Sequence, residues 1–115
     1  MLLLEDDALV AKGLMRILRR LGHRAHHVQT IVEGQARCAS LPEIHVALVD
    51  VGLGNGESGL AFVSWLRREH TEVRRIVISG LAPPSGLGQP PDERFVRKPF
   101  GEPELAAALR PELRS

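Results

Sequence analysis

One run of residues limits the possible folds of this chain more than any other. Positions 44–49 are six residues, five of them apolar, and they end in Asp50. A nearly continuous apolar run of this length is typical of a strand buried on both faces, and therefore of the centre of a parallel sheet. In open α/β sheets, binding and chemistry collect at the carboxyl ends of such strands. We therefore predict that the Asp50 carboxylate, which the glycine-rich segment 51–56 follows, is the reactive group.

The rest of the chain alternates between strand-like and helix-like segments. The predicted strands lie at residues 2–4, 25–28, 44–50, 76–79 and 94–97, and the predicted helices at 10–21, 30–41, 58–69 and 102–109. Thr30 and Glu33 form a capping box at the start of the second helix, Ser58 can cap the third, and Pro103 suits the first turn of the last. This alternation predicts a single (βα)₅ domain over residues 1–115, built on a parallel sheet.

Residues 80–93 break the alternation, because this stretch holds four prolines and three glycines. Proline removes a backbone donor and clashes with the preceding turn, and glycine loses more backbone entropy than any other residue when a helix forms. We therefore expect the helix between the last two strands, which would be the fourth of the domain, to be shortened or lost.

Composition excludes several classes of protein. No apolar run approaches the roughly 20 residues that cross a bilayer, and the early acidic residues are unlike a signal peptide. The formal net charge of +1 is too small to indicate a nucleic-acid surface. We therefore expect a cytoplasmic protein with no membrane and no nucleic-acid partner. The single cysteine, Cys38, falls on a predicted helix, where we expect a buried, inert thiol.

Four of the predicted strands end in groups that can act together at one edge of the sheet: Glu5 with Asp6, then Asp50, Ser79 and Lys98. The carboxylates form an oxygen-rich pocket suited to Mg²⁺, which takes one or two carboxylates plus waters and phosphate oxygens. Lys98 supplies a point charge for an anion that arrives at Asp50, and Ser79 supplies a hydroxyl donor. A carboxylate, a metal ion, a lysine and a hydroxyl are what phosphoryl transfer onto an aspartate requires.

These residues resemble the motifs of the response-regulator receiver domains, and the resemblance covers nearly the whole chain, from residue 2 to about 109. Glu5 and Asp6 match that family's metal-binding pair after the first strand. Asp50 matches its phosphoacceptor, and Gly52 matches the residue whose backbone carbonyl completes the metal site. The matches are individually weak, but their order on alternating strands makes the set specific.

The later strands carry the remaining matches. Ser79, followed by the small Gly80, is similar to the Thr/Ser–Ala/Gly step of the family. The sequence at 98–100, Lys-Pro-Phe, is similar to a motif whose Lys–Pro bond is typically cis. Phe95 matches the aromatic side chain that changes rotamer on activation.

The resemblance implies a flavodoxin-like, doubly wound α/β fold with strand order 2-1-3-4-5, the order known for a chemotaxis regulator of this family. It implies a two-component signalling protein rather than an enzyme: Asp50 would accept a phosphoryl group from a histidine kinase or a histidine phosphotransfer protein, and only slow self-dephosphorylation would follow. Mg²⁺ and Lys98 would stabilise the transferring group, Ser79 would bond a phosphoryl oxygen, and Phe95 would swing inward. Such a chain either acts alone or is a piece of a larger protein, and its downstream target is not implied.

Two other functions stay open at this point. The first is a receiver-like module that works by contacts alone, although such a module would have no use for the acidic pair, Ser79 and Lys98. The second is a nucleotide-binding enzyme, because residues 54–59 satisfy G-x-G-x-x-G between a strand and a helix. Against the enzyme, three residues separate this pattern from Asp50, and the nearby carboxylates would repel a pyrophosphate.

The histidines suggest no site of their own. His23, His26 and His27 are close in sequence, but adjacent residues on a strand point to opposite faces of the sheet. We therefore expect surface or edge-strand histidines rather than a metal cluster.

Overall fold

A sheet of five parallel strands forms the centre of the molecule. The computed structural model describes residues 1–53, 58–80 and 93–110. The strands are β1 (Leu2–Leu4), β2 (His26–Val28), β3 (Val46–Asp50), β4 (Arg74–Ser79) and β5 (Glu93–Arg97), and they lie in the order β2-β1-β3-β4-β5. Every neighbouring pair is parallel. The predicted fold class and strand order are therefore confirmed.

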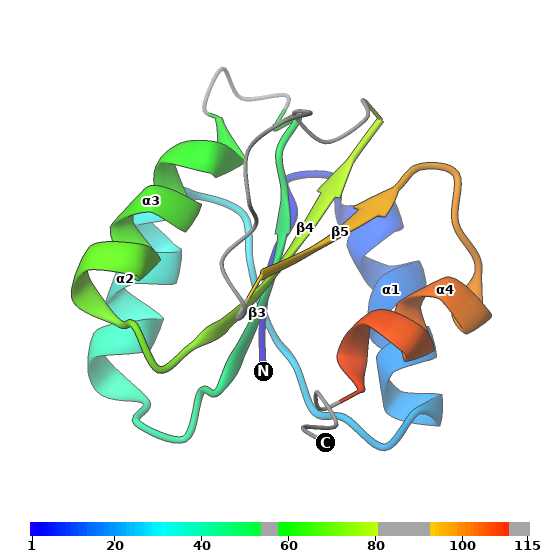
Figure 1. Ribbon diagram of the computed structural model, residues 1–115, viewed down its shortest axis with the longest axis horizontal. Coiled ribbons are helices and arrows are strands. Elements are labelled where there is room, and N and C mark those ends of the chain that lie inside the picture. Colours follow the sequence, from blue (N-terminus) through cyan, green and yellow to red (C-terminus); the bar gives the residue numbers. More distant parts are fainter. Residues whose placement is uncertain (54–57, 81–92, 111–115) are drawn as a thin grey trace, which may run out of the picture.

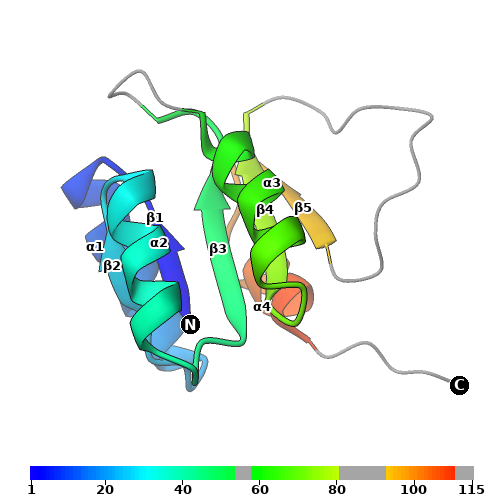
Figure 2. The ribbon, with the colours of Figure 1, turned by 90° about the vertical axis from the view of Figure 1, so that its left-hand side faces the viewer.

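Helices cover both faces of this sheet. They are α1 (Ala8–Arg20), α2 (Ile31–Ser40), α3 (Gly59–Glu69) and α4 (Glu102–Leu109). Figure 1 shows α2 and α3 on one face and α1 and α4 on the other, and in Figure 2 α2 and α3 lie in front of the strands. Each face closes over its own apolar cluster, around Phe62 of α3 on the first face and around Leu18 of α1 on the second. This is the doubly wound arrangement that the sequence predicts.

Three helices begin at the carboxyl edge of the sheet, each with a side-chain cap. Asp7, Thr30 and Ser58 accept hydrogen bonds from backbone N–H groups in the first turns of α1, α2 and α3, at 2.9, 3.2 and 3.3 Å. Such caps satisfy N–H groups that a helix leaves unpaired at its start. The helix starts are thereby fixed directly beside the strand ends that carry the candidate site.

The connection between β4 and β5 falls almost wholly outside the described residues. Segment 81–92, on which the expected shortened or lost helix falls, lies outside the described residues; the described residues on either side of it contain no helix. In the part of the chain that the structure describes, no helix is both long and apolar enough to cross a membrane.

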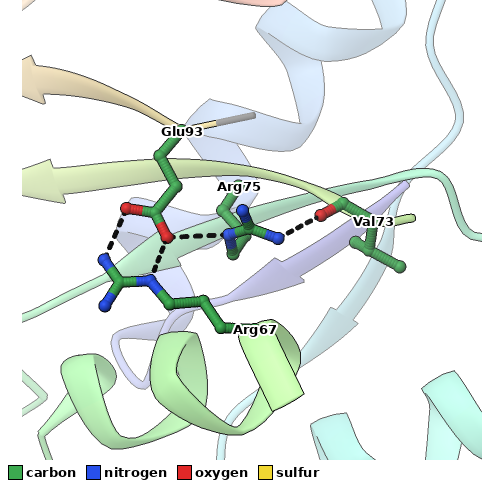
Figure 3. A network of polar contacts seen from close by, with 4 residues as sticks. All are labelled: Arg67, Val73, Arg75 and Glu93. Carbon is green, nitrogen blue, oxygen red and sulfur yellow. Dashed lines mark hydrogen bonds and ion pairs between the residues drawn. The ribbon is translucent and has the colours of Figure 1, made fainter. Parts of the chain in front are cut away.

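A buried ion network joins β4 and β5 to α3 (Figure 3). Arg75 and Glu93 are register partners on the two strands, and the Arg75 Nε donates to the Glu93 Oε1 at 2.8 Å. Arg67 of α3 donates through both Nε and Nη2 to the two oxygens of the same carboxylate. The side chains of Glu93 and Arg75 are only 1% and 4% exposed. The network therefore replaces apolar packing on this part of the sheet face.

The charge of Glu93 depends on its two partners. Burial by itself raises the pKa of Glu93, but the hydrogen bonds from Arg67 and Arg75 outweigh burial and hold the pKa below its ordinary value. A third contact also holds the Arg75 guanidinium, because the Arg75 Nη1 donates to the Val73 carbonyl at 2.9 Å. The carboxylate therefore stays ionised although almost no solvent reaches it.

Replacing Glu93 by glutamine is expected to lower the free energy of unfolding by about 3 kcal/mol, because the buried Arg75 then keeps its charge without a counter-charge. Since the pKa of Glu93 is lower in the folded than in the unfolded chain, this stabilisation is complete above the unfolded value of 4.5 and is lost as the pH falls through the folded value. Denaturant unfolding of wild type and Glu93→Gln at neutral and acid pH measures both effects. Glu69→Gln, which removes an exposed carboxylate from α3, is the control and should change stability by less than about 0.5 kcal/mol. Equal losses in both variants, or a Glu93→Gln difference that does not shrink in acid, would contradict the prediction.

Candidate functional site

Asp50 ends β3 with its carboxylate almost wholly buried, since only 3% of the residue is exposed. Its Oδ2 accepts a hydrogen bond from the Lys98 Nζ at 2.9 Å, and its Oδ1 accepts one from the Gly52 backbone N–H at 3.1 Å. Lys98 follows directly after β5, and its side chain is 40% exposed. A buried carboxylate is thus paired with one cation that solvent still reaches.

Glu5 lies beside Asp50 because β1 and β3 are neighbours in the sheet. Leu4 and Val49 are register partners, so the residues that follow them, Glu5 and Asp50, leave the sheet side by side. Glu5 is only 2% exposed. Burial raises the pKa of Glu5 to about 7, and a hydrogen bond with Asp50 adds to the rise. Two buried carboxyl groups therefore lie side by side, and this arrangement favours an added positive charge.

The three acidic residues after β1 have separate roles. Asp7 is exposed and caps α1, and its backbone N–H donates to the Glu5 Oε2 at 3.3 Å. Asp6 is half-buried, and a side-chain hydrogen bond between Glu5 and Asp6 adds to the raised pKa of Glu5. Asp7 therefore serves the helix, whereas Glu5 interacts with both Asp50 and Asp6.

Ser79 and Phe95 lie on one face of the sheet at different depths. Ser79 is the last residue of β4, and its backbone carbonyl accepts a hydrogen bond from the Lys98 N–H at 2.8 Å. The Lys98–Pro99 bond that follows is cis. Phe95 is the register partner of Val77 and packs, half-buried, against the apolar cluster beneath α2 and α3. Because side chains two residues apart share a face, Phe95 lies one step inward from Ser79.

The donor atoms at this edge suit a partly hydrated Mg²⁺ ion. Glu5, Asp6 and Asp50 offer carboxylate oxygens and Gly52 a carbonyl, and burial together with the hydrogen bond to Asp50 raises the pKa of Glu5, so a bound cation would favour its ionised form. Within the described ranges, no three carboxylate, histidine or cysteine side chains gather closely enough to hold a metal ion alone. Mg²⁺ itself takes only one or two carboxylates and keeps several waters and phosphate oxygens as further ligands.

Gly59, the first residue of α3, is required by the position of Asp50. A Cβ atom at Gly59 would lie 2.1 Å from the Asp50 carbonyl oxygen and 2.8 Å from its carbonyl carbon. Both are backbone atoms and cannot rotate away, so only a residue without a side chain allows α3 to start this close to the strand. The sequence pattern places Gly59 in a loop motif but does not reveal this contact.

His27 is a second residue that sequence reasoning missed. Its Nε2 lies 2.7 Å from the backbone carbonyl oxygen of Glu5, so this nitrogen is the donor. His27 sits on the edge strand β2, one register step before Val28. The predicted strand order pairs this strand with β1, but only the register shows that the imidazole lies near the end of β1. The side chain holds the backbone at the point where the acidic pair begins.

The other candidates do not join the site. His70 pairs with Glu72 at 3.5 Å and lies against the Trp65 ring, with centroids 4.9 Å apart. Cys38 is buried, and burial, followed by the charge of Glu72, raises the pKa of its thiol. Residues 54–57 of the dinucleotide pattern lie outside the described residues, and the Gly59 N–H donates to the Val51 carbonyl at 3.0 Å rather than pointing at a ligand.

Comparison with known proteins gives one consistent result. The family model described as the response regulator receiver domain matches residues 1–110. The transcriptional regulatory protein VxrB of Vibrio cholerae is 29% identical over 119 residues, which cover 100% of this chain and 46% of that protein. The chain therefore spans about half the length of this curated relative.

Solved structures agree with this match. The receiver domain of the response regulator PhyR from Erythrobacter litoralis superposes with a TM-score of 0.76 at 25% identity, covering 94% of this chain and 84% of that one. A response regulator from Burkholderia pseudomallei, solved with a phosphorylated aspartic acid and a calcium ion, superposes with a TM-score of 0.75 at 26% identity, covering 95% of this chain and 65% of that one.

Substituting Gly59 by alanine is expected to destabilise the fold by about 1–3 kcal/mol and to shift the Asp50 backbone, because the new Cβ collides with the Asp50 carbonyl. Gly13→Ala is the matched control: Gly13 lies inside α1 with nothing within 4 Å of the added Cβ, so this change should stabilise the protein by about 1 kcal/mol. Denaturant unfolding gives both signs, and amide chemical shifts near Asp50 report the displacement. A neutral Gly59→Ala with unchanged shifts would refute the steric argument.

Proposed function

Because the chain belongs to the response regulator receiver domain family, we propose that it accepts a phosphoryl group on Asp50 from a phosphohistidine and changes conformation as a result. The observation that carries this proposal is the buried Asp50 carboxylate, bonded to the Lys98 ammonium at 2.9 Å and crowded by the Glu5 carboxyl group. The family is a signalling module, and the donor would be a histidine kinase or a histidine phosphotransfer protein.

The proposed phosphoryl transfer takes place at the Asp50 carboxylate. One carboxylate oxygen attacks the phosphorus, the phosphorus–nitrogen bond of the donor breaks, and the imidazole leaves. Lys98 can follow the charge from the carboxylate to the arriving phosphoryl oxygens, because its ammonium is a point charge on a flexible side chain that is 40% exposed. Glu5, Asp6, Asp50 and the Gly52 carbonyl would hold Mg²⁺, whose charge offsets that of the phosphoryl group.

The switch would run from Ser79 to Phe95. The Ser79 carbonyl is bonded to the Lys98 backbone, so β4 and β5 move together at this edge. A hydroxyl that turns toward the phosphoryl oxygen leaves space on the same sheet face, and the half-buried Phe95 is the next bulky side chain inward. Phosphorylation would thus be converted into a change of packing.

Exposed apolar side chains surround the same edge and support docking of a protein donor. The described part of the chain exposes four large hydrophobic residues: Leu9, Val10, Val32 and Leu60. All four lie in the first turns of α1, α2 and α3, which begin beside the strand ends. Leu9 is the most exposed, at 82%. Single exposed apolar residues are ordinary, but their gathering around the reactive carboxylate indicates an interaction surface.

Incubation with Mg²⁺ and acetyl phosphate is expected to add one phosphoryl group to the wild-type protein, as measured by intact mass. Asp50→Asn should gain none, because an amide is not a nucleophile for this transfer. Removal of Mg²⁺ by a chelator should abolish the gain in the wild type. The control Glu69→Gln removes an exposed carboxylate at the end of α3, away from the carboxyl ends of the strands. This variant should be phosphorylated like the wild type.

Three results would contradict this function. No gain in a folded wild-type protein that binds Mg²⁺ would favour a module that acts by contacts alone. A gain that persists in Asp50→Asn would place the phosphoacceptor elsewhere. Specific binding of a dinucleotide by the unphosphorylated protein would favour the nucleotide-binding enzyme instead.

A further inference from the structure

A basic groove lies at the edge of the sheet opposite to Asp50. It has a volume of about 1280 Å³ and runs between α1 and the residues that precede β1, β2 and β3. Met1 comes just before β1, Ala25 just before β2, and Glu43 a few residues before β3, so the groove is at the amino ends of the strands. It shares no lining residue with the candidate phosphorylation site.

Four cationic side chains line this groove, against one carboxylate, Glu43. Lys12, Arg16 and Arg19 lie at helical spacing on one face of α1, so they form a stripe that extends for about 10 Å along the helix. Arg24 continues the stripe beyond the end of the helix. The whole chain has a formal net charge of only +1, so the positive charge is concentrated here.

These cations are not used by the fold. Lys12, Arg16, Arg19 and Arg24 are exposed, and among the described residues none of them forms an ion pair or a side-chain hydrogen bond. Arg20, one position beyond the stripe, shows the contrast: it pairs with Glu102 of α4 at 2.8 Å. The charges of the groove are therefore available to a ligand.

The floor of the groove is apolar. Met1, Met15 and Ala25 line it and are half-buried against the core cluster beneath α1 and α4. Methionine adapts its shape to a bound apolar side chain, and methionine-lined grooves suit helical ligands. The surface thus combines an adaptable apolar strip with a cationic border.

We propose that this groove binds an amphipathic helix of a partner protein that is acidic along one face. Carboxylates repeating at helical spacing would match Lys12, Arg16 and Arg19, while apolar side chains of the same helix would cover Met1 and Met15. A nucleic-acid backbone would use the cations but not the apolar floor, because its contacts run through phosphates. The proposal is independent of phosphoryl transfer, since the groove and Asp50 are at opposite edges of the sheet.

The test uses a labelled synthetic helical peptide, about four turns long, with glutamates at successive helical positions on one face and leucines beside them. Fluorescence anisotropy should show saturable binding to the wild-type protein, and binding should weaken with added salt. The double variant Arg16→Glu with Arg19→Glu should bind about tenfold more weakly or worse, because like charges then face each other. Amide chemical shifts should move along α1 and around Met1 when the peptide binds.

The matched control is Arg37→Glu with Arg68→Glu, which changes the net charge equally on exposed positions of α2 and α3. It should bind the peptide like the wild type. Both double variants should keep the wild-type circular dichroism and the wild-type uptake of phosphate from acetyl phosphate. A failure of the docking proposal is then distinct from a failure of Asp50 chemistry.

Three outcomes would overturn the proposal. The first is no binding of the acidic peptide to the folded wild-type protein. The second is equal weakening in both double variants, which would show attraction by net charge alone. The third is tighter binding of a DNA duplex or of phosphatidylserine vesicles that displaces the peptide, which would assign the groove to a phosphate-bearing ligand.

Discussion

The burial of two neighbouring carboxyl groups is the constraint on which the candidate site of this molecule is built. Glu5 and Asp50 emerge side by side from neighbouring strands, and the sheet register leaves them no other place. A single ammonium, that of Lys98, offsets part of the negative charge. The strands that carry these groups are far apart in sequence, so the groups come together only because the strands are neighbours in the parallel sheet. A site that buries two carboxyl groups in this way favours an added cation, and the proposed phosphoryl transfer would use that cation.

The sequence predicted most of the fold because its signals are local and mutually consistent. The apolar run before Asp50 and the caps Thr30 and Ser58 each specify one element without reference to the rest. The predicted site residues carry an equally local signal, since Glu5, Asp50, Ser79 and Lys98 each lie at the end of a strand or directly after it. Parallel strands with right-handed crossovers then bring such ends to one edge.

What the sequence could not show depends on contacts between distant residues. The prediction began β4 at Ile76, whereas the strand begins at Arg74, because charged residues ordinarily mark a solvated segment. Arg75 can be buried because Glu93, 18 residues later in the chain, supplies its counter-charge. Arg67 of α3 binds the same carboxylate. The roles of His27 and Gly59 were not predicted for a similar reason. Both residues contact backbone carbonyl groups, and no pattern of side chains in the sequence reveals such contacts.

The turn after Asp50 is fastened at its base, and this has a use in protein engineering. Gly52 and Ser58 form an antiparallel bridge, and the Val51 carbonyl accepts hydrogen bonds from the N–H groups of Leu53 and Gly59 at 3.2 and 3.0 Å. The bridge and these hydrogen bonds therefore tie the end of β3 to the start of α3 without help from the residues between positions 53 and 58. Lengthening a loop adds little closure entropy, about 0.6 kcal/mol for each doubling. A fluorescent reporter inserted between the two bridge residues would thus sit next to Asp50 in the sequence while the bridge keeps β3 and α3 in place.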